Sequence, residues 1–168
     1  MIRKAEQKDV AEMLEIFNYN ILTSTALYMY ETQTLEERMA WFEGKMERNE
    51  PLYVYEKDGR VAGYVTYGPF RAYPAYLYTV EHSVYVNKAF YRQGIGSKLM
   101  EFIIAYAEAQ GIKTLIGGID AENVASILSH EKLGFTHSGT IRNAGYKFER
   151  WLDLAFYQLD LPGPKGNA

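Results

Sequence analysis

One short segment of the sequence combines glycines with a basic residue at a spacing suited to anion binding. The segment is Arg92-Gln93-Gly94-Ile95-Gly96-Ser97, between an expected strand and an expected helix. Glycines there let the backbone approach a ligand closely, and the free N–H groups of a first helical turn attract phosphate oxygens. It is neither a Walker A loop nor GxGxxG, because no Gly-Lys-Ser/Thr follows and position 99 is Leu. The segment could bind a pyrophosphate, or it could be only a tight turn.

A second candidate is a carboxylate within an otherwise uncharged strand. Glu81 lies in the run Thr79-Val80-Glu81-His82-Ser83-Val84-Tyr85-Val86. Burial beside apolar neighbours would raise the pKa of Glu81 toward the range useful for a general base. An exposed or hydrogen-bonded strand glutamate is the alternative interpretation. His82 lies on the apolar side of the same strand and is interpreted as a core histidine.

A third group lies on an expected helix between Asn123 and Leu133. Asn123, Ser126 and His130 fall on one face, so that Asn123 and His130 could point at the same cleft. Asn123 is equally suited to cap the helix N-terminus. His130 could donate a proton near neutral pH, or it could satisfy a buried hydrogen bond.

The elements that must position these residues follow from periodicity and turn signals. Asp9 can cap a first helix, Thr34 and Glu37 form a capping box for a second, and Asp58-Gly59 is a two-residue hairpin signal. A strand, a helix and another strand around Gly94 predict a βαβ unit with a parallel pair. The predicted elements are a strand at 2–5, the two helices, strands at 52–57, 60–67 and 76–86, a helix at 94–110, a strand at 112–119, a helix at 123–133, and a closing antiparallel hairpin of 135–141 with 148–161.

The fold class is therefore a mixed α/β (α+β) domain with a mostly antiparallel sheet and one central βαβ unit. Residues 1–161 are expected to form a single domain. The C-terminal PGPKGNA, residues 162–168, is expected to be a disordered tail, because Pro and Gly prevent regular structure there.

Composition excludes several classes of protein. The chain has 168 residues, a formal net charge of -3 and no cysteine, which rules out disulfides, thiolate metal sites and cysteine nucleophiles. The three histidines are not at metal-ligand spacings, and no metal is expected. The absence of a Lys/Arg block argues against nucleic acid as a partner. With no signal peptide and no apolar stretch approaching the ~20 residues that span a bilayer, we expect a cytoplasmic protein without a membrane partner.

The order of these motifs resembles the GNAT superfamily of N-acetyltransferases, and within it the phosphinothricin and methionine sulfoximine acetyltransferase branch. The resemblance spans nearly the whole chain, which makes it more specific than any single motif. It is carried by TVEHSVYV, RQGIGSKL, Asn-x-x-Ser and HEKLGF, and at branch level by Ile16-Phe17-Asn18, Glu37-Arg38, Trp41-Phe42, Phe70-Arg71, Gly145-Tyr146-Lys147-Phe148 and Arg150-Trp151.

The resemblance implies a site for acetyl-CoA, with helices on both faces of the sheet. The backbone of Val84, Tyr85 and Val86 would pair with the pantetheine arm, and the amides from Arg92 to Ser97, including Gln93, Gly94, Ile95 and Gly96, would hold the pyrophosphate. Asn123 would bond the pantetheine or thioester end, with Ser126 and Lys132 from the following helix at the cofactor. Two positions depart from the usual pattern: Tyr91 stands where Gln or Arg is common, and His130 stands where many members have a tyrosine that protonates the departing thiolate.

The resemblance also implies the reaction and the acceptor. Glu81 would act as general base and His130 as a second catalytic residue, while the acetyl group passes directly to the α-amine of a small amino acid or analogue. Such an activity is associated with resistance to toxic amino-acid analogues. Residues expected to bind the acceptor are Tyr28, Glu31, Phe70, Arg71, Tyr146 and Lys147, the last two from the same chain or from the second subunit of a homodimer. The alternatives are acetylation of a protein N-terminus or lysine, and a non-catalytic acyl-CoA-binding module.

Overall fold

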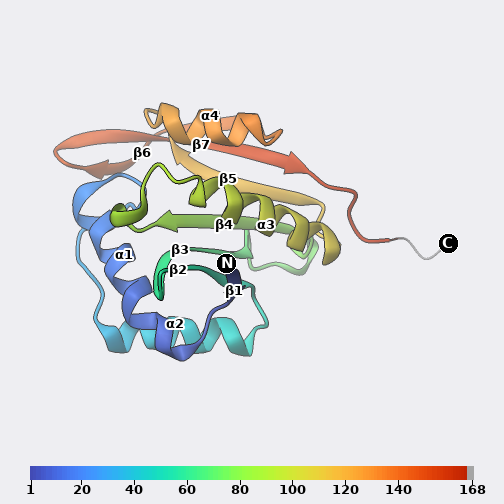
Figure 1. Ribbon diagram of the computed structural model, residues 1–168. Helices are drawn as coiled ribbons and strands as arrows, with labels where there is room; N and C mark the ends of the chain where they lie inside the picture. The colour runs from blue at the N-terminus through green and yellow to red at the C-terminus, as the bar shows by residue number, and fades with distance from the viewer. Residues whose placement is uncertain (166–168) are drawn as a thin grey trace. The chain divides into compact units, whose positions relative to one another are not determined.

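The computed structural model describes residues 1–165, which contain four α-helices and seven strands (Figure 1). The helices are α1 (Val10–Thr23), α2 (Leu35–Glu47), α3 (Ile95–Ala109) and α4 (Val124–Lys132). The strands are β1 (Ile2–Lys4), β2 (Leu52–Lys57), β3 (Arg60–Pro69), β4 (Thr79–Val86), β5 (Thr114–Asp120), β6 (Thr136–Lys147) and β7 (Arg150–Asp160).

The seven strands form one sheet in the order β1-β2-β3-β4-β5-β7-β6. The ladders β1–β2, β2–β3, β5–β7 and β6–β7 are antiparallel, whereas β4 and β5 are parallel. Strand β4, helix α3 and strand β5 make up the βαβ unit. The predicted mixed, mostly antiparallel sheet with a central βαβ unit is therefore confirmed.

The chain divides into two compact units, and each is described separately. Unit 1 comprises Met1–Tyr67 with Ser83–Met100, and unit 2 comprises Gly68–His82 with the chain from Glu101 onward. The division passes through β4 between His82 and Ser83, so the candidate residues of that strand fall into both units.

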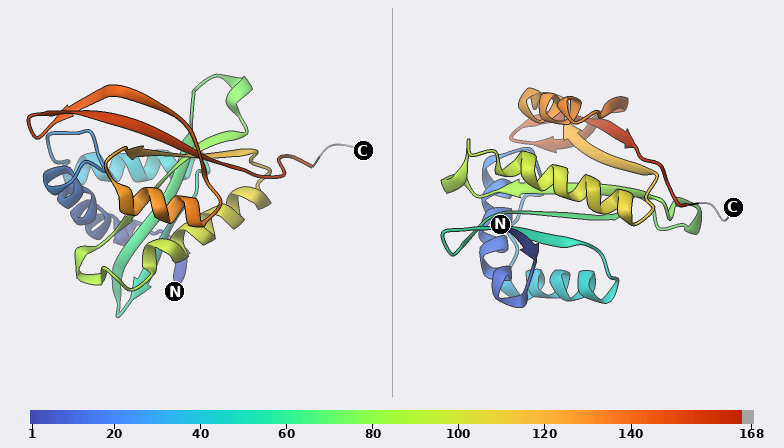
Figure 2. Two further views of the ribbon diagram at one scale, coloured as in Figure 1. Left: turned by 90° about the horizontal axis from the view of Figure 1, so that it is seen from above. Right: turned by 45° about the vertical axis from the view of Figure 1, so that its right-hand side comes forward.

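In unit 1, α1 and α2 lie against the same side of β1, β2 and β3 (Figures 1 and 2). The apolar residues of α1 recur at helical spacing and bury one face, and β2 contributes the alternate residues Leu52 and Val54. The resulting core contains Ala5, Val10, Met13, Ile16, Phe42, Leu52, Val54, Val61 and Tyr64.

In unit 1, the predicted capping box and hairpin turn are present, but the predicted side-chain cap of α1 is not. The Thr34 hydroxyl accepts the Glu37 N–H at 3.1 Å, and the Glu37 carboxylate accepts the Thr34 N–H at 3.1 Å, which confirms the capping box. Asp58 and Gly59 have φ of 52° and 71°, as a two-residue hairpin turn requires. Asp9 precedes α1, but the prediction that its side chain caps the helix is wrong. Its carboxylate is occupied instead by the Arg3 guanidinium and the Glu6 N–H.

In unit 2, most predicted boundaries agree within three residues, but the predicted end of the penultimate strand at 141 is wrong. Strand β6 continues to Lys147 through two register shifts, and Asn143 has a φ of 53° at the second of them. The polar run Arg142-Asn143 resembles a loop in sequence, yet β7 supplies partners for Gly145, Tyr146 and Lys147. Strand β4 begins at Thr79, not at 76, because Pro74 starts a short 3-10 turn before it.

Of the expected tail, residues 162–165 carry no helix or strand, and Gly163 is buried next to Lys113. Residues 166–168 lie outside the described part of the chain.

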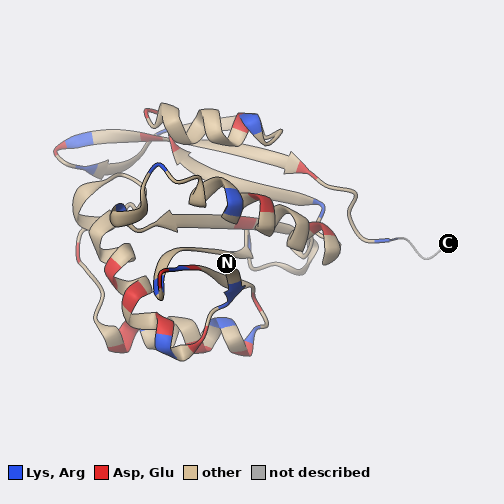
Figure 3. Cartoon of the chain, in the orientation of Figure 1, with Lys and Arg blue, Asp and Glu red and all other residues tan. Residues whose placement is uncertain are grey.

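Figure 3 shows basic and acidic residues interspersed along the chain rather than gathered in one block. No helix among residues 1–165 is long and apolar enough to cross a membrane.

Candidate active site

The glycine-bearing loop in unit 1 has the geometry expected of an anion-binding turn. Arg92 and Gly94 adopt left-handed φ of 63° and 75°, and α3 starts at Ile95. The N–H of Lys98 donates to the Gly94 carbonyl at 3.1 Å, so the N–H groups of the three residues between them precede the helical ladder. These N–H groups and the positive end of the helix dipole favour an anion at this position.

Gly96 is not required by the protein's own packing. A Cβ atom at Gly96 would lie 3.6 Å from Val86 Cγ2, which is ordinary contact, and its φ lies outside the left-handed range. Gly94, in contrast, is needed for its backbone conformation, although nothing lies within 4 Å of a Cβ there. The space beside Gly96 therefore suits the close approach of a phosphate to the main chain.

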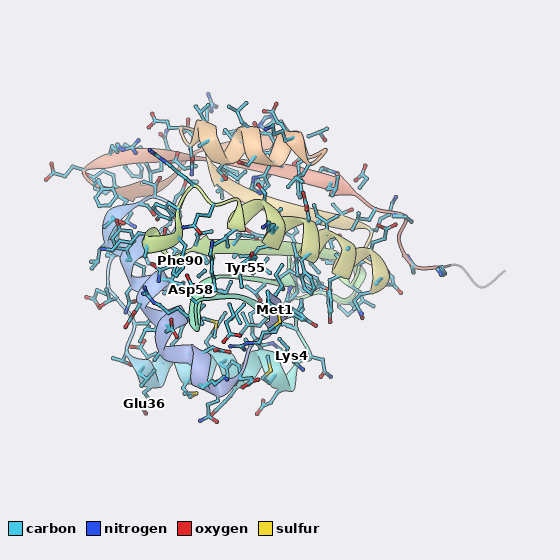
Figure 4. All side chains as sticks on the ribbon, viewed as in Figure 1. Met1, Lys4, Glu36, Tyr55, Asp58 and Phe90 are labelled. Atoms are coloured by element: carbon cyan, nitrogen blue, oxygen red, sulfur yellow. The ribbon has the colours of Figure 1, made fainter. Side chains whose placement is uncertain are left out.

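The β2–β3 hairpin places cations beside this loop. Lys57 donates to the side-chain oxygen of Gln93 at 2.5 Å, and the Arg60 guanidinium lies 5.4 Å from the centre of the Phe90 ring. Figure 4 labels Asp58, at the hairpin turn, and Phe90, just before the loop, on the same side of unit 1. Together with Arg92, these cations favour a ligand with several negative charges.

The segment of β4 that was predicted to bind the cofactor contacts an aromatic cluster. The Tyr85 ring lies 5.3 Å from that of Tyr64 and 6.2 Å from that of Phe17. Arg38 lies between Phe17 and Trp41, at 3.9 and 3.6 Å from the ring centres, and donates to the Tyr64 hydroxyl at 2.9 Å. Burial lowers the pKa of Arg38. The sequence argument treated Arg38 only as part of a motif and missed that it is buried.

Glu81 in unit 2 is exposed, as one of the two sequence interpretations expected, yet its pKa is raised as the other expected. It pairs with Ile116 in the parallel ladder of β4 with β5, and its side chain is exposed. No described residue gives its carboxylate a hydrogen bond or an ion pair. Nearby protein atoms displace enough water to raise its pKa. A raised pKa strengthens Glu81 as a proton acceptor near neutral pH.

His82 and His130 form a hydrogen-bonded pair on the opposite face of β4. Their Nε2 atoms are 2.9 Å apart, and His130 Nδ1 is 2.7 Å from the Ser126 carbonyl oxygen. A carbonyl only accepts, so Nδ1 of His130 carries the proton and its Nε2 accepts from the Nε2–H of His82. Burial lowers the pKa of His82 to about 3 and also lowers that of His130, so the pair is neutral near pH 7.

The hydrogen bonds of His130 restrict its predicted role as a proton donor. His82 is the buried residue that the sequence indicated, but its partner on α4 was missed. Both nitrogens of His130 are bonded within the protein, so the ring presents no free N–H to a ligand in this arrangement. Nδ1 of His82 is buried and has no partner among the described residues.

Two consecutive glycines of β5 allow these side chains to approach the strand on both faces. A Cβ at Gly117 would lie 3.0 Å from His82 Cε1 and 3.1 Å from the Nε2 atoms of both histidines. A Cβ at Gly118 would lie 3.0 Å from a carboxylate oxygen of Glu81. The sequence analysis missed both, although consecutive glycines inside a strand are a signal for close approach.

On α4, Asn123 occupies the N-cap position, one of the two alternatives that the sequence left open. Its side-chain oxygen accepts the Ser126 N–H at 3.2 Å, which leaves its NH2 group for a ligand. The Ser126 hydroxyl is 3.5 Å from His130 Nδ1. Lys132 is exposed at the last position of the helix.

The residues expected to bind the acceptor lie in both units. In unit 2, Phe70 packs edge-on against Tyr76 and Phe156, with ring centres 6.3 and 6.0 Å away, and the exposed Arg71 lies 5.4 Å from the Phe70 ring centre. Tyr146 and Lys147 lie at the end of β6; burial lowers the pKa of Lys147.

Unit 1 contains the other predicted acceptor residues. Tyr28 and Glu31 lie between α1 and α2, and Glu31 is exposed. Unit 1 also contains the loop and Val84–Val86, whereas unit 2 contains Glu81, His130 and the α4 residues. Among residues 1–165, no group of three or more His, Cys, Asp or Glu is arranged to hold a metal ion.

Comparison with known proteins identifies the family. A model of the acetyltransferase (GNAT) domain matches residues 2–156, and the chain belongs to this family. It is 40% identical over 160 residues to an L-methionine sulfoximine/L-methionine sulfone acetyltransferase of Salmonella typhimurium, covering 95% of this chain and 94% of the relative. It is 41% identical over 165 residues to a phosphinothricin N-acetyltransferase of Streptomyces viridochromogenes, covering 97% and 90%.

Solved structures agree with this assignment. An N-acetyltransferase from Staphylococcus aureus has a TM-score of 0.94 and 51% identity, covering 95% of this chain and 97% of its own. A phosphinothricin acetyltransferase from Sinorhizobium meliloti in complex with acetyl-CoA has a TM-score of 0.92 and 30% identity, covering 96% and 88%. The predictions of a GNAT fold, of acetyltransferase activity and of acetyl-CoA as the acetyl donor are confirmed.

Proposed function

We propose that this enzyme transfers the acetyl group of acetyl-CoA to the α-amine of a small amino acid or amino-acid analogue. The observation that carries the proposal is Glu81, an exposed carboxylate with a raised pKa beside the open position of Gly118. Relatives named as acetyltransferases of methionine sulfoximine and methionine sulfone, or of phosphinothricin, support this choice of acceptor.

The donor is proposed to bind through the main chain of unit 1. The N–H groups at the start of α3 hold the pyrophosphate, with Arg92 and Gln93 beside it, and the backbone of Val84–Val86 pairs with the pantetheine arm. Asn123, Ser126 and Lys132 contribute from α4. Backbone amides supply most of these contacts, so Tyr91 does not prevent binding.

Glu81 then makes the acceptor amine nucleophilic. An α-ammonium cannot attack a thioester until it loses a proton, and Glu81 accepts that proton directly or through one water. The amine nitrogen forms a bond to the acetyl carbonyl carbon, the carbon–sulfur bond breaks, and CoA departs as the thiolate. Backbone N–H groups of β4 stabilise the intermediate oxyanion. The second amine proton leaves as the amide forms, and the thiolate or solvent takes it up.

His130 remains a predicted catalytic residue, but its role is constrained by the geometry. To protonate the departing thiolate with its Nδ1–H, the ring would have to release the Ser126 carbonyl, because its Nε2 carries no proton in this arrangement. A thiol with a pKa of about 8.5 is a tolerable leaving group without an acid. His130 therefore contributes less to turnover than Glu81 in this proposal.

Acceptor binding and assembly complete the proposal. Arg71 is proposed to pair with an acceptor carboxylate or phosphinate through two parallel hydrogen bonds. The rest of the acceptor site is proposed to be shaped by Phe70, Tyr28, Glu31, Tyr146 and Lys147.

The enzyme is proposed to work in the cytoplasm as a homodimer that detoxifies amino-acid analogues, without nucleic-acid or membrane partners. The exposed Tyr146, Phe148 and Trp151 side chains of the β6–β7 hairpin support a contact with a second subunit.

A thiol-release assay tests the proposed function. The purified protein is mixed with acetyl-CoA and, separately, with L-methionine sulfone, phosphinothricin, a peptide with a free N-terminus and a lysine peptide. We expect thiol release with the two amino-acid analogues and none with the peptides. Release only with a peptide would favour protein acetylation, and tight acetyl-CoA binding without any release would favour a binding module.

A further inference from the structure

Phe156 of β7 stands out because it borders the proposed base although no motif pointed to it. Strand β5 pairs Gly118 with Phe156, and the ladder of β4 with β5 pairs Glu81 with Ile116. Side chains two residues apart on a strand share a face, as do cross-strand partners. Glu81, Gly118 and Phe156 therefore lie on the same face of unit 2, opposite the face that holds His82 and His130.

The distances agree with this placement. The point that a Cβ of Gly118 would occupy lies 3.0 Å from a Glu81 carboxylate oxygen, 3.4 Å from Leu154 Cδ1 and 3.6 Å from Phe156 Cε1. A group located at this point would therefore touch the proposed base on one side and an apolar wall on the other. Gly118 itself is exposed, so the point is accessible.

The strand partners of Phe156 have no side chains that could cover its ring. Its cross-strand partners are Gly118 on β5 and Gly139 on β6, and nothing lies within 4 Å of a Cβ at Gly139. The ring is supported instead from one side by Phe70, which packs edge-on against it at 6.0 Å. Phe70 in turn lies under the Arg71 guanidinium. Phe156 is partly buried, and an aromatic ring that is supported from one side and still partly accessible is suited to packing against a ligand.

We propose that Phe156 is a specificity-determining residue and that the side chain of the acceptor packs against its ring. With the amine at Glu81 and the acid group at Arg71, the acceptor side chain packs on Phe156 and Leu154. An uncharged side chain of methionine length that ends in a methyl group on sulfur gains apolar contact there, because apolar groups pack favourably against an aromatic ring. A carboxylate side chain loses hydration there without gaining a partner. This inference rests on the proposed function.

Selectivity between two acceptors tests the role of Phe156. We would compare kcat/KM for L-methionine sulfone and for L-alanine in the wild type and in Phe156→Ala. The wild type is expected to favour the sulfone, and the variant is expected to lose about tenfold of that preference, the usual range for a few methylenes of apolar contact. Phe156→Leu, which keeps apolar contact, should lose less. Phe102→Leu on α3 is the matched control for replacing a partly buried ring.

The outcomes separate selectivity from folding. If both acceptors lose the same factor, or the preference does not change, Phe156 has only a structural role and the inference is wrong. Thermal melting of each variant identifies misfolding, and Phe156→Leu retains the test if Phe156→Ala does not fold.

A binding measurement separates this inference from the proposed function. Calorimetry of L-methionine sulfone with the enzyme and CoA needs no turnover. Binding that weakens in Phe156→Ala, in an enzyme that acetylates no amino acid, would support the subsite and overturn the proposed reaction. If the enzyme acetylates amino acids but Phe156→Ala changes neither selectivity nor binding, the proposed reaction is supported and the subsite is overturned.

Discussion

Gly117 and Gly118 are neighbours on β5, yet they serve opposite faces of the strand. Gly117 is buried under His82 and His130, whose rings lie 5.4 and 5.0 Å from that of Phe135. Gly118 is exposed between Glu81 and Phe156. Neither glycine has a side chain that would collide with a titratable group. Gly117 leaves room for the His82 and His130 rings to pack, whereas Gly118 leaves room for a ligand to reach Glu81. The residue type alone does not distinguish these roles; the neighbours on each face do.

The largest effect on turnover is expected from Glu81, on the face of the sheet where Gly118 is exposed. Glu81→Gln should lower kcat by about 100-fold or more, within the usual size of a general-base contribution, and leave acetyl-CoA affinity near normal. Because the pKa of Glu81 is raised in the fold, ionisation at pH 7 opposes folding, so the variant should melt at the same temperature or higher. Kinetics and thermal melting check both parts. Glu101→Gln, an exposed glutamate of α3, is the control, and equal turnover in the two variants would remove Glu81 from the role.

The buried face should respond through stability. Gly117→Ala would press a methyl group against both imidazoles, which cannot retreat without breaking their 2.9 Å hydrogen bond. Overpacking of this kind costs roughly 1–3 kcal/mol of unfolding free energy. Urea unfolding measures the loss. A variant as stable as the wild type would show that the histidine pair is looser than described.

The two faces should also differ in their dependence on pH. The pKa of His82 is about 3 in the fold, below the usual histidine value of 6.5, so the unfolded chain binds more protons as pH falls. The stabilisation from keeping His82 neutral is therefore complete above pH 6.5 and is lost as pH falls toward 3. The slope approaches about 1.4 kcal/mol per pH unit for one proton. Urea unfolding between pH 7 and 5 should show a smaller slope in His82→Phe, and an unchanged slope would contradict this.

Gly118→Ala should affect turnover more than stability. Its methyl group would meet the end of the flexible Glu81 side chain, which can move aside. A displaced base is expected to lower kcat by about tenfold, since misplacement by about 1 Å can cost up to 100-fold. The melting temperature should stay within the range of exposed substitutions. A large loss of stability would mean that Gly118, like Gly117, is required for packing.

The smallest effect concerns the cofactor loop. Gly96→Ala has room in the protein, 3.6 Å from Val86, and alanine favours a helix over glycine by about 1 kcal/mol. The variant should therefore melt no lower than the wild type. We expect about fivefold weaker acetyl-CoA binding, equivalent to about 1 kcal/mol, because the methyl group occupies the space left for a phosphate. Calorimetry measures this, and unchanged affinity would move the phosphate away from Gly96.

Sequence reasoning singled out the glycine-bearing loop and Glu81 as site candidates because each depends on a short local pattern. The glycines, the start of α3 and the parity of β4 are all encoded within a few residues. It missed Phe156, Gly117, Gly118 and the pairing of His82 with His130, since those contacts join segments separated by tens of residues. It also ended β6 too early, because cross-strand pairing with β7 overrides the loop-like composition of Arg142-Asn143.

The stacking of Arg38 on Trp41 gives the protein a built-in optical reporter. The chain has two tryptophans, and they lie in different units: Trp41 is partly buried against a guanidinium, whereas Trp151 is 64% exposed on β7. Their intrinsic fluorescence should differ in emission wavelength and in quenching by iodide. Single Trp→Phe replacements therefore allow the unfolding of each half of the molecule to be followed by its own signal.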